Sequence, residues 1–123
     1  NITPRNLSED GLRKSITNQA TIDERMIDRY WELVRFPGNR RATGKRFAWY
    51  REGRSSLDVS SITAPTLIIW GEDDKIIPVE AGYIMDRDIK DSELIILKDT
   101  GHIPMEEAPK ETLIILNNFL KQK

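Results

Sequence analysis

The sequence contains no cysteine and a single histidine. The lack of cysteine excludes disulfide bonds, thiolate metal sites and a cysteine nucleophile, and one histidine is too few for a histidine-rich zinc site. No apolar run approaches the roughly 18 residues that a membrane-spanning helix needs. The net charge is only −1, so no strong basic field would attract nucleic acid. We therefore expect no metal, no cofactor, no nucleic acid and no membrane as partners of this chain.

The chain is short, with 123 residues, and this length allows one small domain at most. Apolar residues make up 38% and charged residues 32% of the chain, and the apolar residues occur in organised blocks, which argues against disorder. The sequence begins Asn-Ile-Thr-Pro without methionine and without a basic-then-apolar signal pattern. We therefore expect a segment of a longer protein, located in the cytoplasm.

Residues 1–56 are polar, rich in arginine and helical in pattern. Ser8 is placed to cap a first helix that extends to about Thr17. Thr21 and Glu24 form a capping-box pattern before a second helix, which Phe36-Pro37-Gly38 ends. The expected third helix covers about residues 39–51, and Gly53-Arg54-Ser55-Ser56 is typical of a linker.

The remainder, residues 57–123, predicts a β-α-β-α order. Thr66–Trp70 is a continuous apolar run between proline and glycine, typical of a parallel strand covered on both faces. Pro78 opens a helix, Leu94–Leu97 is a second apolar strand, and a last helix opens at Pro109. Two strands are too few for a sheet that stands alone. We therefore expect missing neighbours, supplied by an N-terminal portion of the same protein or by a second copy.

Chemistry-bearing residues follow both predicted strands. Asp73 and Asp74 come after the first strand, and His102 comes after the second. Because adjacent parallel strands place their carboxyl ends at one edge of a sheet, a carboxylate and the histidine converge there. A carboxylate that accepts a hydrogen bond from imidazole fixes its tautomer and stabilises the imidazolium. This arrangement amounts to two members of a nucleophile–histidine–acid triad.

These two segments together resemble the α/β-hydrolase fold superfamily. Pro65–Asp74, followed by Ile76-Ile77-Pro78, is similar to its acid-bearing segment, and Thr100-Gly101-His102 with Glu106-Glu107-Ala108-Pro109 is similar to its histidine segment. The resemblance implies that Asp74 is the acid, with Asp73 as a conceivable substitute, and that His102 is the catalytic histidine. It also implies an α/β fold, in which a helical cap segment, 1–56, precedes the C-terminal part of the hydrolase sheet, 57–123.

The nucleophile elbow of that superfamily, Gly-x-Ser-x-Gly, is absent from the sequence. The nearest match, Gly53–Leu57, lacks the second glycine and follows a predicted helix, so we interpret Ser55 as a linker serine. The nucleophile is expected upstream, outside this chain. The implied parent enzyme hydrolyses an ester or a related carbon–heteroatom bond of a small molecule, with either serine or aspartate as its nucleophile.

Two other functions stay open at this point. Asp73 and Asp74 at a strand end are oxygen ligands of the kind that Mg²⁺ prefers, with Asp99 as a third carboxylate. Alternatively, the absence of a nucleophile is compatible with a non-catalytic interaction module. Glu106 and Glu107, close to Pro109, are interpreted as acidic residues that complement the dipole of the last helix.

Overall fold

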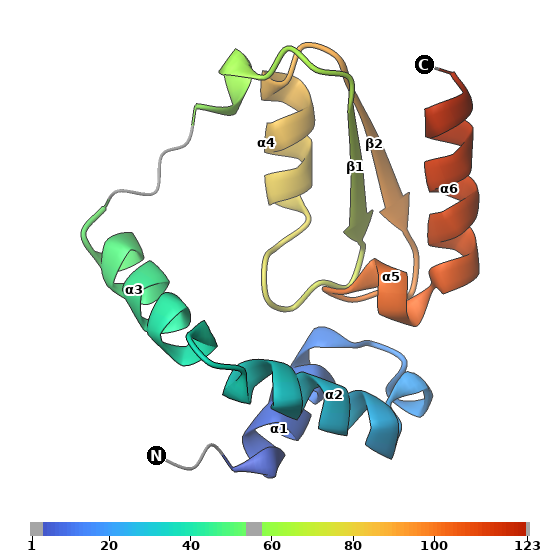
Figure 1. Cartoon of the computed structure of the whole chain (residues 1–123). Coiled ribbons are helices and arrows are strands. Elements are labelled where there is room, and N and C mark those ends of the chain that lie inside the picture. The colour runs from blue at the N-terminus through green and yellow to red at the C-terminus, as the bar shows by residue number, and fades with distance from the viewer. Residues whose placement is uncertain (1–3, 54–57, 123) are drawn as a thin grey trace. The chain divides into compact units, whose positions relative to one another are not determined.

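The computed structural model describes residues 4–53 and 58–122 of the chain (Figure 1). The chain divides into two compact units. The first comprises the described residues up to Leu12 together with those from Asp23 to Asp58, and the second comprises Arg13–Ile22 with the described residues from Val59 onward. The expected linker residues 54–56, and the expected boundary between 56 and 57, lie outside the described residues.

Three helices dominate the N-terminal half: α1 (Arg5–Ser15), α2 (Glu24–Arg35) and α3 (Asn39–Arg51). All three were expected, but two of them begin at other residues. The first helix starts directly after Pro4, so Ser8 lies inside it and is buried instead of capping it. The second is capped by Asp23, whose side chain accepts a 2.7 Å hydrogen bond from the backbone N–H of Met26. Thr21 instead ends a short 3₁₀ helix, η1 (Gln19–Thr21).

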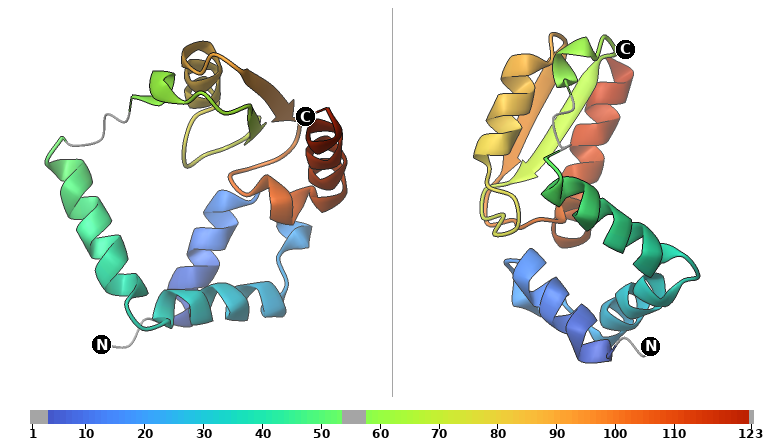
Figure 2. Two further views of the ribbon diagram at one scale, coloured as in Figure 1. Left: turned by 45° about the horizontal axis from the view of Figure 1, so that its top comes forward. Right: turned by 90° about the vertical axis from the view of Figure 1, so that its left-hand side faces the viewer.

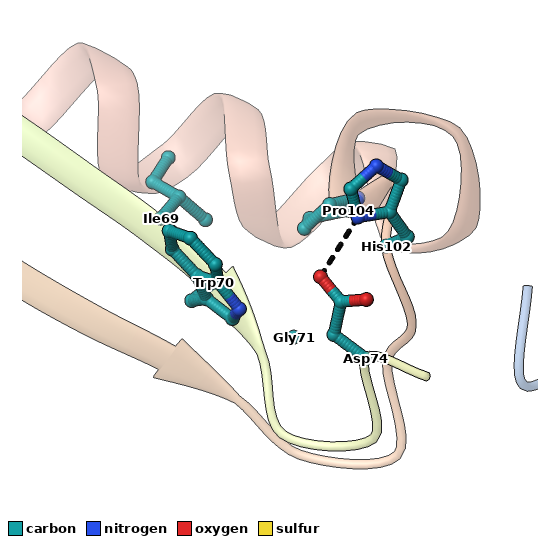
Figure 3. Close-up of a pocket in the computed structure, with 6 residues that line it drawn as sticks. All are labelled: Ile69, Trp70, Gly71, Asp74, His102 and Pro104. Atoms are coloured by element: carbon teal, nitrogen blue, oxygen red, sulfur yellow. Dashed lines mark hydrogen bonds and ion pairs between the residues drawn. The ribbon is translucent and has the colours of Figure 1, made fainter. Parts of the chain in front are cut away.

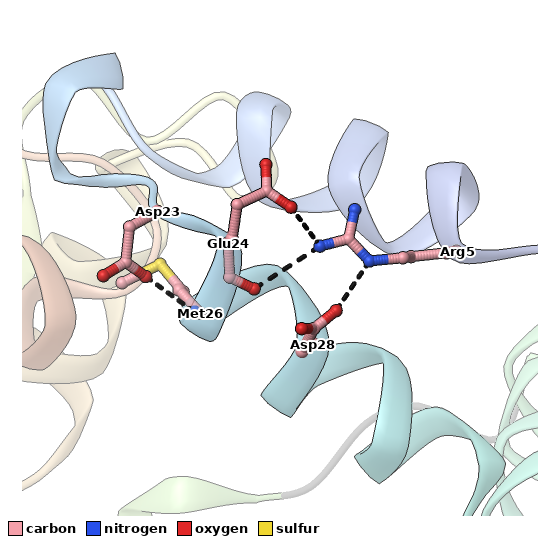
Figure 4. A network of polar contacts seen from close by, with 5 residues as sticks. All are labelled: Arg5, Asp23, Glu24, Met26 and Asp28. Carbon is pink, nitrogen blue, oxygen red and sulfur yellow. Dashed lines mark hydrogen bonds and ion pairs between the residues drawn. The ribbon is translucent and has the colours of Figure 1, made fainter.

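In the first unit, charged side chains join α1 to α2. The Arg5 guanidinium donates Nε–H to Oδ1 of Asp28 at 2.6 Å and contacts Oε2 of Glu24 at 2.5 Å through Nη2 (Figure 4). Both acids are largely exposed, so these pairs add little stability and mainly fix how the helices align. Burial of Leu12, Met26 and Ile27 provides the apolar core of this unit.

The second unit confirms the predicted β-α-β-α order. It contains η2 (Val59–Ser61), β1 (Thr66–Gly71), α4 (Glu80–Asp88), β2 (Ser92–Leu97), α5 (Pro104–Glu107) and α6 (Pro109–Lys121). The two strands are parallel, with Thr66 opposite Ser92 and Gly71 opposite Leu97. Helices α4 and α6 cover opposite faces of this sheet (Figures 1 and 2). The parallel register brings the ends of β1 and β2 to the same edge.

Helix cover over the two strands is partial. Ile68 of β1 is buried, as are Ile16 and Ile89, but most strand residues are only half-buried. The expectation of strands buried on both faces is therefore met only at the centre of β1, because one helix on each face cannot exclude water from both strands. Several large apolar side chains of the two covering helices remain exposed: Tyr83, Ile84, Leu113, Ile114, Leu116 and Leu120.

Candidate active site

Asp74 is held in a tight turn that follows β1. Its Oδ1 accepts hydrogen bonds from the backbone N–H groups of Ile76, at 2.8 Å, and Ile77, at 2.9 Å. Aspartate is favoured in such turns because its short side chain reaches the backbone two or three residues further on. Only 3% of its side chain is exposed. These bonds fix the carboxylate and leave Oδ2 directed toward the loop after β2.

His102 meets that second oxygen. Its Nδ1 lies 2.8 Å from Oδ2 of Asp74, across a small pocket of about 130 Å³ whose lining includes Ile69, Trp70 and Pro104 (Figure 3). The predicted approach of the histidine to this aspartate, within hydrogen-bond reach, is confirmed. About a third of the histidine side chain, 32%, is exposed, and Nε2 has no hydrogen-bond partner among the described residues. The catalytic role of the pair stays a prediction.

The protonation state of Asp74 follows from its surroundings. Burial raises the pKa of this carboxyl, but the hydrogen bonds from His102, Ile77 and Ile76 together outweigh burial and hold the pKa below its ordinary value of 3.8. Asp74 is therefore a carboxylate at neutral pH and can only accept hydrogen bonds. Consequently Nδ1 of His102 carries the proton, and Nε2 presents a lone pair that can take a proton from a nucleophile.

Backbone contacts hold the two loops together. The N–H of Glu72 donates to Leu97 O at 2.9 Å, and the N–H of Asp73 donates to Thr100 O at 3.0 Å. Gly71, the last residue of β1, makes this approach possible. A Cβ atom at this position would lie 2.1 Å from Gly101 O and 2.3 Å from Thr100 O. No side chain fits there unless the histidine loop moves away.

Gly71→Ala is therefore expected to destabilise the protein and to separate His102 from Asp74. Overpacking of this kind costs about 1–3 kcal/mol, and here the clashing atoms belong to backbone that cannot rotate away. Gly44→Ala in α3 is the matched control, because nothing lies within 4 Å of an added Cβ there, and alanine in a helix is favoured by roughly 0.5–1 kcal/mol. Urea unfolding of both variants measures the difference; equal stabilities would contradict the close approach at Gly71.

The other predicted site residues do not join the pair. Asp73 and Asp99 are exposed, and among the described residues no group of three His, Cys, Asp or Glu side chains could hold a metal ion. The alternative of a magnesium site at Asp73 and Asp74 thus gains no support. Ser55 and the nearest match to an elbow lie outside the described residues. No helix within the described ranges is long and apolar enough to cross a membrane.

Glu107 lies near the site and makes contacts that the sequence did not predict. Glu107, at the end of α5, accepts hydrogen bonds from the backbone N–H groups of Gly101, Thr17 and Asn18. The expected contribution to the dipole of the last helix is therefore not its main contact. Thr17 and Glu107 are 90 positions apart, and no local pattern connects them. The available signal was weak: an acidic residue shortly after the histidine.

Comparison with known proteins adds the family. Residues 3–109 match the model of the alpha/beta hydrolase fold family. The chain belongs to this family. The order of the pair, with the acid after one strand and the histidine after the next, agrees with the chain order of α/β hydrolases.

Individual α/β hydrolases are similar over most of this chain. An uncharacterised hydrolase, YugF, of Bacillus subtilis (strain 168) is 34% identical over 120 residues, which is 94% of this chain and 44% of that protein. The 2-hydroxy-6-oxo-6-(2'-aminophenyl)hexa-2,4-dienoic acid hydrolase of Metapseudomonas resinovorans is 32% identical over 91% of this chain and 40% of its own length. The crystal structure of a serine hydrolase involved in carbazole degradation matches with a TM-score of 0.85 and 26% sequence identity. The match covers 98% of this chain and 48% of that protein. The chain thus spans less than half of each of these proteins.

Proposed function

We propose that this chain supplies the acid, Asp74, and the histidine, His102, of a catalytic triad in a hydrolase. The observation that carries the proposal is the 2.8 Å bond between Nδ1 of His102 and Oδ2 of Asp74, while Nε2 has no hydrogen-bond partner among the described residues. The sequence holds no Gly-x-Ser-x-Gly elbow, so the nucleophile belongs to a polypeptide segment outside these 123 residues.

In the proposed reaction, Nε2 of His102 takes the proton of the nucleophile hydroxyl while its oxygen attacks a substrate carbonyl carbon. The imidazolium that forms is stabilised by the Asp74 carboxylate through Nδ1–H. It then gives its proton to the leaving group as the bond to the carbonyl carbon breaks, leaving an acyl-enzyme. A water molecule, deprotonated by the same Nε2, releases the acid and restores the nucleophile.

Serine is the nucleophile that the similar proteins favour, because one of the matching crystal structures is described as a serine hydrolase. An aspartate nucleophile would use the same pair to activate water instead. The substrate class we propose is a small acyl compound, either an ester or a ketone cleaved next to its carbonyl group. Similar proteins include a lipase of Moraxella, 35% identical over 54 residues, and the dienoic acid hydrolase. The helices of residues 1–56 are proposed as the cap over that substrate.

The test uses the whole product of the gene that encodes this chain. Incubation with p-nitrophenyl esters and with a 2-hydroxy-6-oxo-dienoate is expected to give hydrolysis of at least one class. A fluorophosphonate probe is expected to label one serine, which peptide mass spectrometry places outside residues 1–123. Turnover without labelling would favour the aspartate alternative. Labelling of Ser55, or the absence of any hydrolysis, would contradict the proposal.

A further inference from the structure

The Glu107 carboxylate accepts hydrogen bonds from three backbone N–H groups, which belong to two segments far apart in the sequence, residues 17–18 and Gly101. Its Oε2 accepts from Gly101 at 2.7 Å and from Thr17 at 3.2 Å, and its Oε1 accepts from Asn18. The side chain is half-buried, where bonds to a charged acceptor are stronger than neutral ones. The carboxylate therefore ties Gly101, the residue before His102, to Thr17 and Asn18.

A second bond supports the same connection from the other side of Gly101. The N–H of His102 donates to Ser15 O at 2.7 Å, and a Cβ at Gly101 would lie 2.4 Å from that same oxygen. The backbone at residues 101–102 thus has one fixed path between Ser15 and Glu107. The Asp74 carboxylate is already fixed by the turn after β1. A displacement of the backbone at residues 101–102 would therefore move the His102 imidazole relative to that carboxylate.

We propose that Glu107 is a positioning residue that keeps the His102 imidazole within hydrogen-bond distance of Asp74. The proposal rests on the function proposed above only for its catalytic consequence, since the placement of the ring can be measured without turnover. Glutamine is the informative substitution: it preserves the shape of the side chain, but one of its ends becomes an NH₂ donor. That donor would face backbone N–H groups, which also donate.

Nuclear magnetic resonance measures the placement directly, because these 123 residues contain a single histidine. In the whole gene product, with ¹⁵N confined to this segment, the His102 ring is expected to show one tautomer, with a proton fixed on Nδ1. Glu107→Gln is expected to average the two ring nitrogen shifts and to broaden the Nδ1–H signal. Glu93→Gln, the same change at an exposed position of β2, is expected to leave the ring signals unchanged.

Catalysis gives the second measurement. A misplaced histidine is expected to lower kcat of Glu107→Gln by about 100-fold, with KM nearly unchanged, because the ring acts on the reacting atoms and not on substrate binding. The shape of the profile of kcat against pH is expected to change as well. A simple loss of folded protein would instead lower kcat by the same factor at every pH and leave the shape unchanged. Unchanged ring signals together with unchanged kcat would overturn the role of Glu107.

The wild-type protein offers a check that does not depend on a variant that folds. Amide protons of Gly101 and Thr17 are expected to exchange slowly, and hydrogen-bond scalar coupling is expected between the Gly101 nitrogen and the side-chain carboxyl carbon of Glu107. Rapid exchange without coupling would overturn the proposal. Failure of the proposed function is recognised separately: His102→Ala would keep full activity even though Glu107→Gln disturbs the ring.

Discussion

His102→Ala is expected to reduce kcat/KM of the whole enzyme by several orders of magnitude, because the variant has no group that can deprotonate the nucleophile. Asp74→Asn is expected to lower kcat by about 10⁴-fold, since the imidazolium loses the negative charge that stabilises it. The low pKa of Asp74 keeps this charge in place throughout the neutral range. Initial rates on the best ester, measured over a pH series, give both values.

Two further substitutions serve as controls for these losses. Asp73→Asn removes a carboxylate from the same turn, but this side chain is exposed, so a much smaller loss is expected. Ser55→Ala is expected to leave the rate nearly unchanged, because the serine sits in a sequence that lacks the second glycine of an elbow. Equal losses at Asp73 and Asp74 would show that the acid has been assigned to the wrong residue.

The 123-residue chain on its own is expected to be inactive and to associate. Within the described residues, β1 pairs with β2 alone, so its other edge presents backbone N–H and C=O groups that recruit another strand. The apolar side chains exposed on α4 and α6 add to this tendency, because burying each of them contributes roughly 1.5–3 kcal/mol. We propose an N-terminal portion of the same enzyme as the partner, with a second copy as the substitute when that portion is absent.

Light scattering and an ester assay test this expectation together. The lone chain is expected to scatter as a multimer without turnover, and addition of the N-terminal portion is expected to restore hydrolysis. Replacing Leu113 and Leu120 on α6 by lysine is expected to weaken association, whereas Asn117→Lys with Asn118→Lys adds the same charge at exposed polar positions and is expected to have little effect. A stable, well-folded monomer, or ester hydrolysis by the lone chain, would contradict the prediction.

The sequence predicted the parts of the site that depend on local pattern and topology. The apolar run at Thr66–Trp70 and the parallel pairing of two strands were sufficient to bring Asp74 and His102 to one edge. Helix starts were less predictable, because Thr21 and Asp23 are both acceptable caps and only the tertiary path of the chain decides between them. The four-residue helix α5 is too short for an apolar period to be detected.

Contacts between distant segments were beyond prediction. Glu107 binds backbone N–H groups of residues 17 and 18, and backbone groups are present at every position, so the sequence offers no complementary residue to search for. The close approach of Gly71 to the histidine loop could not be predicted either, because a glycine at the end of a strand is typical of any turn. In both cases the specificity resides in the path of the backbone, which a single sequence does not reveal.

The two oxygens of Asp74 accept hydrogen bonds from different partners, and this difference determines how an asparagine side chain would be oriented at the same position. Oδ1 accepts from two backbone N–H groups, and Oδ2 accepts from the imidazole. An asparagine there would keep its carbonyl oxygen on the backbone donors, because its NH₂ group cannot accept them, and would thereby turn that NH₂ toward His102. The imidazole would have to accept at Nδ1 and carry its proton on Nε2. The turn after β1 therefore decides which nitrogen of His102 carries the proton. The backbone bonds of the native turn leave a carboxylate oxygen to accept from Nδ1–H, whereas in Asp74→Asn the same bonds would leave an NH₂ group that donates to Nδ1.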